Sequence, residues 1–504
     1  MSDGLPVDPV VLIAAVLLAF AVLVAGVTRR VQTPSALLFL GIGMLVGDDG
    51  LAIIQLSDPS VVQNLGVVAL LVILFDGGLT TKPTDLRRAA GPASLLATVG
   101  VLLTSAITAF GVWLLLDVEV ATAALIGAVV GSTDAAAVFA MLRGIRLPRR
   151  LAAILKVESG ANDPIAIVIT LTVVEFAVGG ADTANVLQLA LLQPVVGIAV
   201  GGGIGMLGVV VLRRVRLSAD ALYPVLALAV AGVAYGLAAM LGGSGFFAVY
   251  LAGVLVGAKV DRRRRSIRDF HEGLANVAEI GLFLMLGLLV FPTQLPGVAA
   301  AGLLVAVLLT FVARPITVLL CLLPFRLPPR EQAVLGWGGL RGAVPIVLAT
   351  FPITAGYEDA LYVFDIVFFV VLVSILLQGT TITKVIEWLG VTSSRRAWAP
   401  VAEALPLDDV DADLVEAMLT DDLLVAGRWL RDVPLPSGML LVAIARDEQV
   451  VVPRGDTVLL SGDVLMIIAE DPRRAADRIT AWARGEGDIA VDRARPEPPA
   501  VPDG

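Results

Sequence analysis

Cysteine, histidine and charge are all scarce in this chain of 504 residues. It holds one cysteine, Cys321, and one histidine, His271. These counts exclude an intramolecular disulfide and any metal site built from several cysteines or histidines. Charged residues make up 16% of the chain, against roughly 25% in a typical soluble domain. The scarcity of charge therefore argues against an ordinary soluble protein.

Apolar residues make up 58% of the chain and gather in long runs. A bilayer core about 30 Å thick needs roughly 17–25 apolar residues to be spanned by a helix. Thirteen runs approach that length, at residues 8–27, 34–47, 61–79, 91–115, 119–142, 151–177, 187–212, 219–240, 245–259, 272–291, 297–323, 331–353 and 360–389. We expect an all-α polytopic membrane protein with about 13 transmembrane helices over residues 1–390.

The connections between these runs alternate in charge. Every second connection carries Lys or Arg, beginning with Arg29 and Arg30, and the intervening ones carry neither. Under the positive-inside rule, this pattern predicts a protein of the cell inner membrane with its N-terminus outside and its C-terminal part in the cytoplasm. The segment before the first run has no basic residue, which favours a retained helix over a cleaved signal peptide.

The composition changes beyond residue 390. Residues 402–504 hold 21 acidic residues against 10 Arg and no Lys, which argues against nucleic acid as a partner. We expect a linker over 391–412, a small cytoplasmic α+β domain over 413–487 and a disordered Pro-rich tail over 488–504. Within the domain, the pattern predicts four strands and a closing amphipathic helix, at LVEAMLT, MLLVAIARD, EQVVVP, DVLMIIAE and RAADRITAWARG.

One glycine pattern needs a separate interpretation. GIGMLG at 203–208 matches the dinucleotide-binding fingerprint G-x-G-x-x-G. That fingerprint requires a preceding strand and a βαβ unit, whereas here it lies inside an apolar run. We expect these glycines to serve close helix packing.

The apolar run VESGANDPIAIVI (157–169) contains four polar side chains, Glu158, Ser159, Asn162 and Asp163. At about 100° per residue, all four fall on one side of a helix. Ionisable groups inside membrane helices usually mark an ion or proton pathway. A polar contact between two helices is the alternative interpretation.

Two other runs place a charge beside helix-breaking residues. GSTDAAAVFAMLRG, in the fifth run, has Thr133 and Asp134 in mid-span, and GWGGLRGAVPIVLA, in the twelfth, has Arg341 among glycines. Asp134 is suited to capping the second half-helix, to ligating a cation, or to both. Arg341 lies too deep to reach water easily and needs an acidic partner. Interrupted segments seven runs apart indicate an inverted-repeat transporter with its site near the midplane.

Further charges lie within the runs. Asp76 in LVILFDGGLTTK is close to the predicted cytoplasmic end, so that a solvated carboxylate and a cation ligand are both open interpretations. We expect Glu279 and Arg314 to be structural rather than ion-binding.

The motifs TD, ESGANDP and GLRGAVP together resemble those of bacterial NhaP-type sodium or potassium/proton antiporters, within the cation:proton antiporter superfamily, over about residues 8–390. The segment 427–470 is similar to the TrkA-C (RCK-C) domain of potassium-transport regulators, a pairing typical of potassium/proton antiporters. The resemblance implies inverted repeats and a monovalent cation/proton antiporter, potassium being favoured over sodium.

The same resemblance implies which residues bind the ions. Asp163 would bind either the proton or the monovalent cation. Asp134, Ser159 and the Thr133 carbonyl would add oxygen ligands. Asp76 stands where the family often has Glu, and would be a further ligand if its shorter side chain reaches the ion.

Three residues would support this site. By resemblance, Asn162 would brace the broken helix, and Glu158 would pair with Arg341. The Asn162–Asp163 pair resembles the electroneutral branch of the superfamily, because the electrogenic branch carries two adjacent carboxylates. Exchange would then proceed by alternating access, with the proton and the cation competing at Asp163.

Competing functional classes fit the sequence less well. A cation channel needs a continuous pore, commonly with repeated carbonyl or carboxylate rings, and the sequence shows no such repetition. A membrane-embedded enzyme needs a nucleophile–base pair, a metal cluster or a nucleotide loop, and none is evident. We therefore expect a transporter and not an enzyme.

The resemblance also bears on partners. We expect membrane lipids around the helices, a homodimer formed through the membrane domain and the tail, and no cofactor beyond the transported ions. The C-terminal domain is a candidate for binding a small regulatory ligand. The βαβ nucleotide-binding half of the resembled regulators is absent from the sequence.

Overall fold

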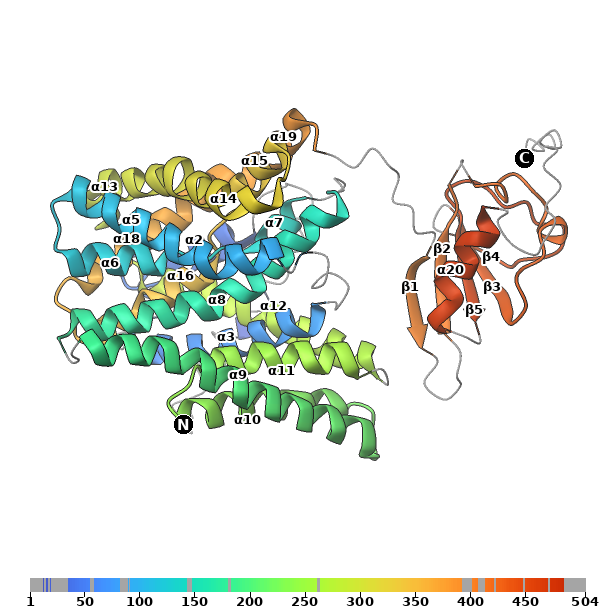
Figure 1. Cartoon of the computed structure of the whole chain (residues 1–504), viewed down its shortest axis with the longest axis horizontal. Coiled ribbons are helices and arrows are strands. Elements are labelled where there is room, and N and C mark those ends of the chain that lie inside the picture. Colours follow the sequence, from blue (N-terminus) through green and yellow to red (C-terminus); the bar gives the residue numbers. More distant parts are fainter. Residues whose placement is uncertain are drawn as a thin grey trace, which may run out of the picture. The chain divides into compact units, whose positions relative to one another are not determined.

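The computed structural model divides the chain into two units, Met1–Thr392 and Ser393–Gly504, each described here by itself (Figure 1). The structure describes residues 12, 15, 16, 19, 35–54, 59–81, 89, 91–142, 147–179, 183–260, 263–391, 401–406, 413–420, 423–446, 449–469 and 472–484. Most of the first predicted run, the basic connections at Arg29 and Lys82, and the predicted disordered tail over 488–504 lie outside these residues.

The described part of the first unit is helical. Its N-terminal half contains α2 (Ser35–Val46), α3 (Pro59–Thr80), η1 (Leu96–Gly100), α5 (Val101–Leu116), α6 (Val120–Val129), α7 (Ala135–Met141), α8 (Arg149–Ala177), α9 (Thr183–Arg214) and α10 (Leu222–Met240). Its C-terminal half contains α11 (Gly245–Lys259), α12 (Arg264–Leu289), α13 (Leu295–Leu308), η2 (Leu309–Ala313), α14 (Arg314–Leu322), η3 (Leu323–Phe325), α15 (Pro329–Trp337), α16 (Ala343–Leu348), α17 (Thr350–Thr354), α18 (Ala360–Ser374), η4 (Ile375–Gly379) and α19 (Thr380–Leu389).

These helices match the predicted membrane spans. Among the described residues, eight helices are long and apolar enough to cross a membrane, and four shorter apolar helices accompany them, at Ala36–Val46, Val120–Val129, Gly245–Lys259 and Ala343–Thr354. The twelve together coincide with the second to thirteenth predicted runs. The fifth and twelfth are short because the chain unwinds in mid-span, as the sequence indicated. The predicted all-α polytopic fold is confirmed.

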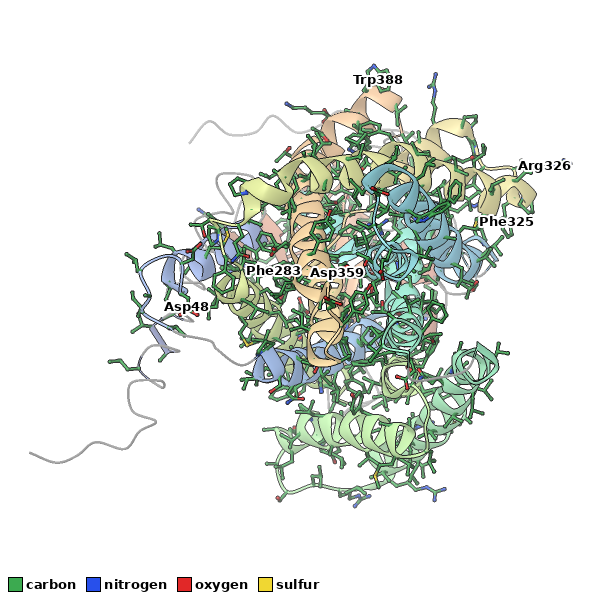
Figure 2. All side chains as sticks on the ribbon, turned by 90° about the vertical axis from the view of Figure 1, so that its left-hand side faces the viewer. Asp48, Phe283, Phe325, Arg326, Asp359 and Trp388 are labelled. Carbon is green, nitrogen blue, oxygen red and sulfur yellow. The ribbon has the colours of Figure 1, made fainter. Side chains whose placement is uncertain are left out.

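Loops predicted on the same side of the membrane contact each other. On the side without basic residues, the Asp49 carboxylate accepts hydrogen bonds from the hydroxyl (2.6 Å) and the backbone N–H (2.8 Å) of Thr293. These bonds hold the pKa of Asp49 below its usual range. Figure 2 looks onto this end of the bundle, where Asp48 is labelled. On the basic side, Arg263 pairs with Asp220 at 2.6 Å. The loops therefore alternate between two ends of one bundle.

Glycines let the helices of this unit approach closely. A Cβ at Gly201 of α9 would lie 2.6 Å from backbone atoms of Ala248 on α11, and one at Gly205 would lie 2.8 Å from Ala252. Within GIGMLG, Gly205 and Gly208 pack against other helices, the latter with a Cβ 2.7 Å from Val230, whereas a Cβ on Gly203 would meet nothing within 4 Å. The predicted packing role therefore holds for two of the three glycines.

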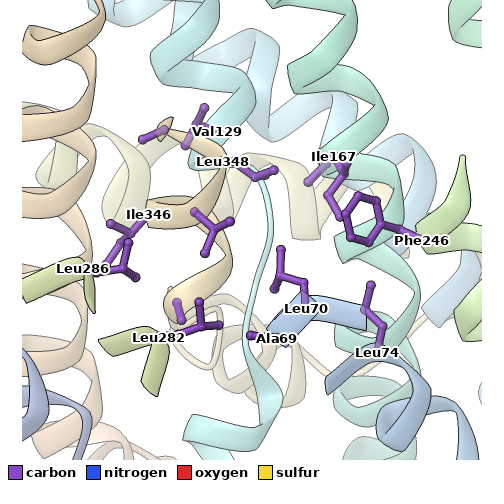
Figure 3. Packing of buried hydrophobic residues seen from close by; sticks show 14 of the residues in the cluster. Ala69, Leu70, Leu74, Val129, Ile167, Phe246, Leu282, Leu286, Ile346 and Leu348 are labelled. Atoms are coloured by element: carbon purple, nitrogen blue, oxygen red, sulfur yellow. The ribbon is translucent and has the colours of Figure 1, made fainter. Parts of the chain in front are cut away.

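Apolar side chains fill the middle of the bundle, where α3, α6, α8, α11, α12 and α16 converge (Figure 3). Ile346 of α16 lies toward Leu286 of α12, and Leu348 lies near Val129 at the end of α6 (Figure 3). All four side chains are fully buried. Packing on both sides therefore positions a helix of only six residues, and with it the unwound segment that precedes it.

In its described residues, the second unit contains a five-stranded antiparallel sheet in the order β1-β2-β5-β3-β4 and an α-helix of about three turns. Its elements are β1 (Val401–Pro406), β2 (Asp413–Met418), η5 (Leu430–Asp432), β3 (Met439–Arg446), β4 (Gln449–Val451), β5 (Val464–Ala469) and α20 (Pro472–Ala483). Side chains such as Leu465 and Ile467 of β5 share a buried core with Ile479 and Trp482 of α20. The predicted α+β domain is confirmed.

One boundary prediction was wrong. The predicted linker over 391–412 contains β1, which pairs with β2 through Ala404↔Val415 and Leu405↔Leu414. VAEALP has a single β-branched residue and a proline, so its own propensity indicates no strand. A proline is tolerated on an edge strand, and pairing with a neighbour decides the conformation there.

We predict that residues 393–504 fold without the membrane unit, because their core is self-contained.

The buried Asp463 carboxylate accepts bonds from Arg446 Nε and Nη2, both at 2.7 Å. Asp463→Ala should therefore cost about 2–3 kcal/mol, somewhat less than a fully buried pair because Arg446 is partly exposed. The control Asp432→Ala, in an exposed pair with Arg431, should cost less than about 1 kcal/mol. Urea unfolding followed by circular dichroism measures both, and a non-cooperative transition in the unsubstituted fragment would contradict the prediction.

Candidate functional site

Two interrupted helices cross in the membrane unit. The first unwinds between α6 and α7, and the second between α15 and α16. At the crossing, the Asp134 N–H donates to the Leu340 carbonyl at 2.7 Å. The Asp134 side chain caps α7 by accepting a hydrogen bond from the Ala137 N–H at 3.1 Å. The predicted broken helices and the predicted cap are therefore both present.

Arg341 fastens the crossing. Its Nη1 donates to the Gly131 carbonyl at 3.2 Å and, more closely, to the Ser132 carbonyl. These carbonyls directly follow the C-terminal end of α6, where backbone acceptors lack helical partners and carry partial negative charge. The Arg341 N–H donates to Ser374 Oγ at 3.1 Å. The guanidinium, which is 1% exposed, is thus held by backbone oxygens of the first unwound segment.

Glycine is required where the two segments meet. A Cβ on Gly342 would collide with the carboxylate of Asp134, and one on Gly339 would lie 2.7 Å from Arg314 Nε. Gly339 and Gly342, which lack a Cβ, therefore let the side chains of Arg314 and Asp134 lie directly against the backbone.

We predicted that Glu158 pairs with Arg341, but the structure gives Glu158 a different arginine as its partner. Glu158 Oε1 pairs with Arg314 Nη2 at 2.6 Å, and both side chains are nearly inaccessible, at 2% and 3%. Arg314 Nη2 also donates to the Leu335 carbonyl on α15 at 3.2 Å. Arg314 reaches Glu158 from α14, whereas Arg341 is turned toward the end of α6. The prediction that Arg314 is structural agrees with this arrangement.

The four polar residues of α8 divide between two sides of the helix. Glu158 and Asn162 are buried, at 2% and 1% exposure, while Ser159 and Asp163 are partly exposed. Asn162 Nδ2 donates to Thr133 Oγ1 at 2.6 Å and to the Thr133 carbonyl at 3.3 Å. The expectation of one shared polar face was therefore too simple, because an arc of about 140° is wide enough to meet two environments.

Asp163 interacts electrostatically with Asp134 and Arg341. Glu279 of α12, which we expected to be structural, lies within electrostatic range of Asp134. Carboxylates therefore gather beside the crossing. With the Ser159 hydroxyl, they supply the hard oxygen atoms that suit a monovalent cation, and each carboxylate can instead be neutralised by a proton.

Asp76 has different charged neighbours. Its carboxylate, on α3, interacts with Glu272, Arg268 and Lys156, and Asp163 is not among these groups. The structure therefore brings Thr133, Asp134, Asn162, Asp163 and Arg341 to one crossing. Ser159 lies one turn before Asp163 on α8, and the role of Asp76 as a ligand stays a prediction.

The sequence interpretation missed two supporting residues. Ser374 Oγ donates to Gln378 Oε1 at 2.5 Å, and Gln378 Nε2 donates to the Trp337 carbonyl at 3.2 Å. Together they connect the span α18–α19 to both sides of the second unwound segment. A buried glutamine four residues after a serine in an apolar run was the available signal. The part of the chain that the structure describes contains no cluster of three His, Cys, Asp or Glu suited to a metal ion.

We predict that Glu158 and Arg314 are energetically coupled. Glu158→Gln or Arg314→Gln alone leaves one buried charge without its partner and should cost about 3–5 kcal/mol. The double variant should recover at least about 1 kcal/mol of the summed loss. The control cycle, Glu158→Gln with Arg341→Gln, should show weaker coupling, because those two side chains interact electrostatically but form no direct ion pair. Unfolding in detergent measures both cycles, and equal coupling would contradict the assignment.

Comparison with known proteins agrees with this architecture. The family described as "Sodium/hydrogen exchanger, transmembrane" matches residues 16–388, and the TrkA-C domain family matches residues 414–477. The K(+)/H(+) antiporter NhaP of Alkalimonas amylolytica is 37% identical over 467 residues, covering 91% of this chain and 81% of that protein. The K(+)/H(+) antiporter NhaP2 of Shewanella sp. (strain MR-4) is 36% identical over 485 residues, covering 93% and 82%.

A solved structure shows the same fold. The sodium proton antiporter MjNhaP1 of Methanocaldococcus jannaschii at pH 8 superposes with a TM-score of 0.65 at 24% identity, covering 73% of this chain and 98% of that one. The crossing of interrupted helices, the family matches and this likeness lead to one assignment. The chain belongs to the sodium/hydrogen exchanger family and carries a TrkA-C domain after its membrane unit.

Proposed function

We propose that this protein exchanges K+ for H+ across the membrane by alternating access. The observation that carries the proposal is the gathering of Asp163 and Asp134 beside the crossing, next to backbone that is not helical. Unwound backbone at membrane depth is tolerated where it lines a site, and transporters of inverted-repeat architecture bind their ions there.

Asp163 is the shared carboxylate in this proposal. It lies on the partly exposed side of α8 with Ser159. The buried side of α8 instead carries Glu158 and Asn162, which bind Arg314 and Thr133. Asp134, Ser159 and the Thr133 carbonyl complete the oxygen ligands. Asn162 keeps Thr133 in place through its amide group. A proton and a cation neutralise the same charge, so that binding one displaces the other.

Potassium is favoured over sodium by the relatives. Two proteins named as K(+)/H(+) antiporters are 36–37% identical over more than nine-tenths of this chain. The Na(+)/H(+) antiporter ApNhaP of Aphanothece halophytica is 28% identical over 72% of it. The TrkA-C domain also supports potassium, because its pairing with such a membrane unit is typical of the potassium/proton antiporters that the sequence resembles.

The remaining expectations complete the proposal. The charge alternation of the loops supports an outside N-terminus and a cytoplasmic TrkA-C domain in the inner membrane. That domain would regulate exchange, with a small ligand as the candidate effector. The expected homodimer, formed through the membrane unit and the tail, stays a prediction.

Asp163→Asn should abolish exchange, because the charge for which proton and cation compete is gone. The matched control is Glu175→Gln, at an exposed position on the same helix, which should keep wild-type rates. Dequenching of a pH dye in proteoliposomes, driven in turn by K+, Na+ and Rb+, measures the loss and the ion preference. Flux above the level of empty vesicles in folded Asp163→Asn protein would refute the assignment.

Exchange should be one-for-one and electrically silent, because Asn162 provides no second titrating group beside Asp163. We expect an imposed membrane potential, at fixed ion gradients, to leave the reversal point unchanged. A shifted reversal point would contradict the stoichiometry and make Glu279 the carboxylate to substitute next. A passive current without proton coupling would instead indicate a cation channel.

A further inference from the structure

A second polar stripe on α8 leads away from Asp163 toward the basic end of the bundle. Lys156, Ser159, Gly160 and Asp163 are partly exposed and spaced i, i+3, i+4 and i+7, which places them on one helix face. Lys156 precedes Asp163 by two turns, about 10 Å along the helix. A lysine therefore lies on the same face as the proposed ion-binding carboxylate, near the end that carries the basic loops.

Lys156 reaches across to another helix. Its Nζ donates to the Thr80 carbonyl at the C-terminal end of α3, at 2.9 Å. Helix C-terminal carbonyls carry partial negative charge and attract cations. Lys156 also interacts electrostatically with Asp76, one turn earlier on α3. Asp76 Oδ1 is buried without a hydrogen-bond partner among the described residues. The ammonium is thus bonded to a carbonyl and lies within electrostatic range of a carboxylate, the same kinds of group that would receive a monovalent cation.

The bond from Lys156 to Thr80 joins α8 to α3, and these two helices pack against different neighbours. Helix α3 packs closely on α11, where a Cβ at Gly78 would lie 2.5 Å from the Tyr250 carbonyl. Helix α8 packs on α6 and carries the ion-binding face. Between them, a Cβ at Gly160 would lie 3.0 Å from the Tyr250 hydroxyl. The Lys156–Thr80 bond therefore spans the seam along which α8 faces α3 and α11.

We propose that the Lys156 ammonium is a tethered cation that occupies the entrance between the basic end of the bundle and Asp163. The transported cation must displace it from Thr80 and Asp76 to reach the central site. Lys156 thereby weakens apparent cation affinity from that side, which is the cytoplasmic side in the proposed orientation. Arg268 and Glu272, the other charged groups around Asp76, complete this entrance. The inference rests on the proposed antiport.

Charge removal and chemical rescue test the proposal in the full-length protein. Lys156→Cys should lower the apparent KM for K+ about three- to tenfold in everted membrane vesicles. This is the change in affinity expected when one positive charge, several ångströms from the cation in a partly screened site, is removed. Treatment with 2-aminoethyl methanethiosulfonate restores an ammonium and should return the KM toward the wild-type value. Methyl methanethiosulfonate adds no charge and should not. The native Cys321 is buried, which limits background reaction.

Lys384→Cys, at an exposed lysine on α19, is the matched control and should keep the wild-type KM with either reagent. An unchanged KM in Lys156→Cys, or the same response to both reagents, would overturn the proposal. If the cysteine variant does not fold, Lys156→Gln should lower the KM and Lys156→Arg should not, and equal values would overturn it. The wild type measured in the same vesicles separates the Lys156 proposal from the antiport proposal. If the wild type shows no saturable exchange, the antiport itself is refuted.

Discussion

The bonds from Arg341 to the carbonyls that follow α6 are the interaction on which the rest of the membrane unit depends. An unwound segment inside a bilayer exposes backbone groups that water cannot reach, and each unsatisfied group costs several kcal/mol. Here the two interruptions satisfy each other, through Arg341 and through the Asp134–Leu340 backbone bond. The crossing therefore allows two helices to stop in mid-membrane and leaves Asp134 beside Asp163.

The charges around the crossing explain why this structure suits exchange. Two buried guanidiniums, those of Arg314 and Arg341, face a larger number of carboxylates, and Glu158 is already paired with Arg314. The excess negative charge lies with Asp134 and Asp163, close enough to repel each other. Excess like charge in a partly desolvated site is costly, and either a proton or a monovalent cation relieves it. In the proposed mechanism, this cost is why the site would bind one of its two substrates at a time.

Helix α8 has a structural role on one side and the proposed ion-binding carboxylate on the other. Its buried side carries Glu158 and Asn162, which attach it to Arg314 and to Thr133 of the first interruption. Its partly exposed side carries Asp163 and faces α3 and α11. If α8 moved against α3, the crossing would move with α8, because buried polar bonds link α8 to the crossing. Close packing among α3, α9 and α11, by contrast, relies on glycine and apolar contacts.

The sequence by itself determined the features that depend on neighbouring residues. Apolar run length and loop charge defined the spans, and Thr133-Asp134 and GLRG marked the interruptions, because capping and helix breaking act within a few residues. Only the tertiary structure decided that Glu158 pairs with Arg314 and not Arg341, that α8 has two polar environments, and that Glu272, Arg268 and Lys156 surround Asp76. Two arginines in different helices were equally suitable partners by chemistry. The direction from which each helix approaches α8 chose between them, and no local sequence pattern encodes that direction.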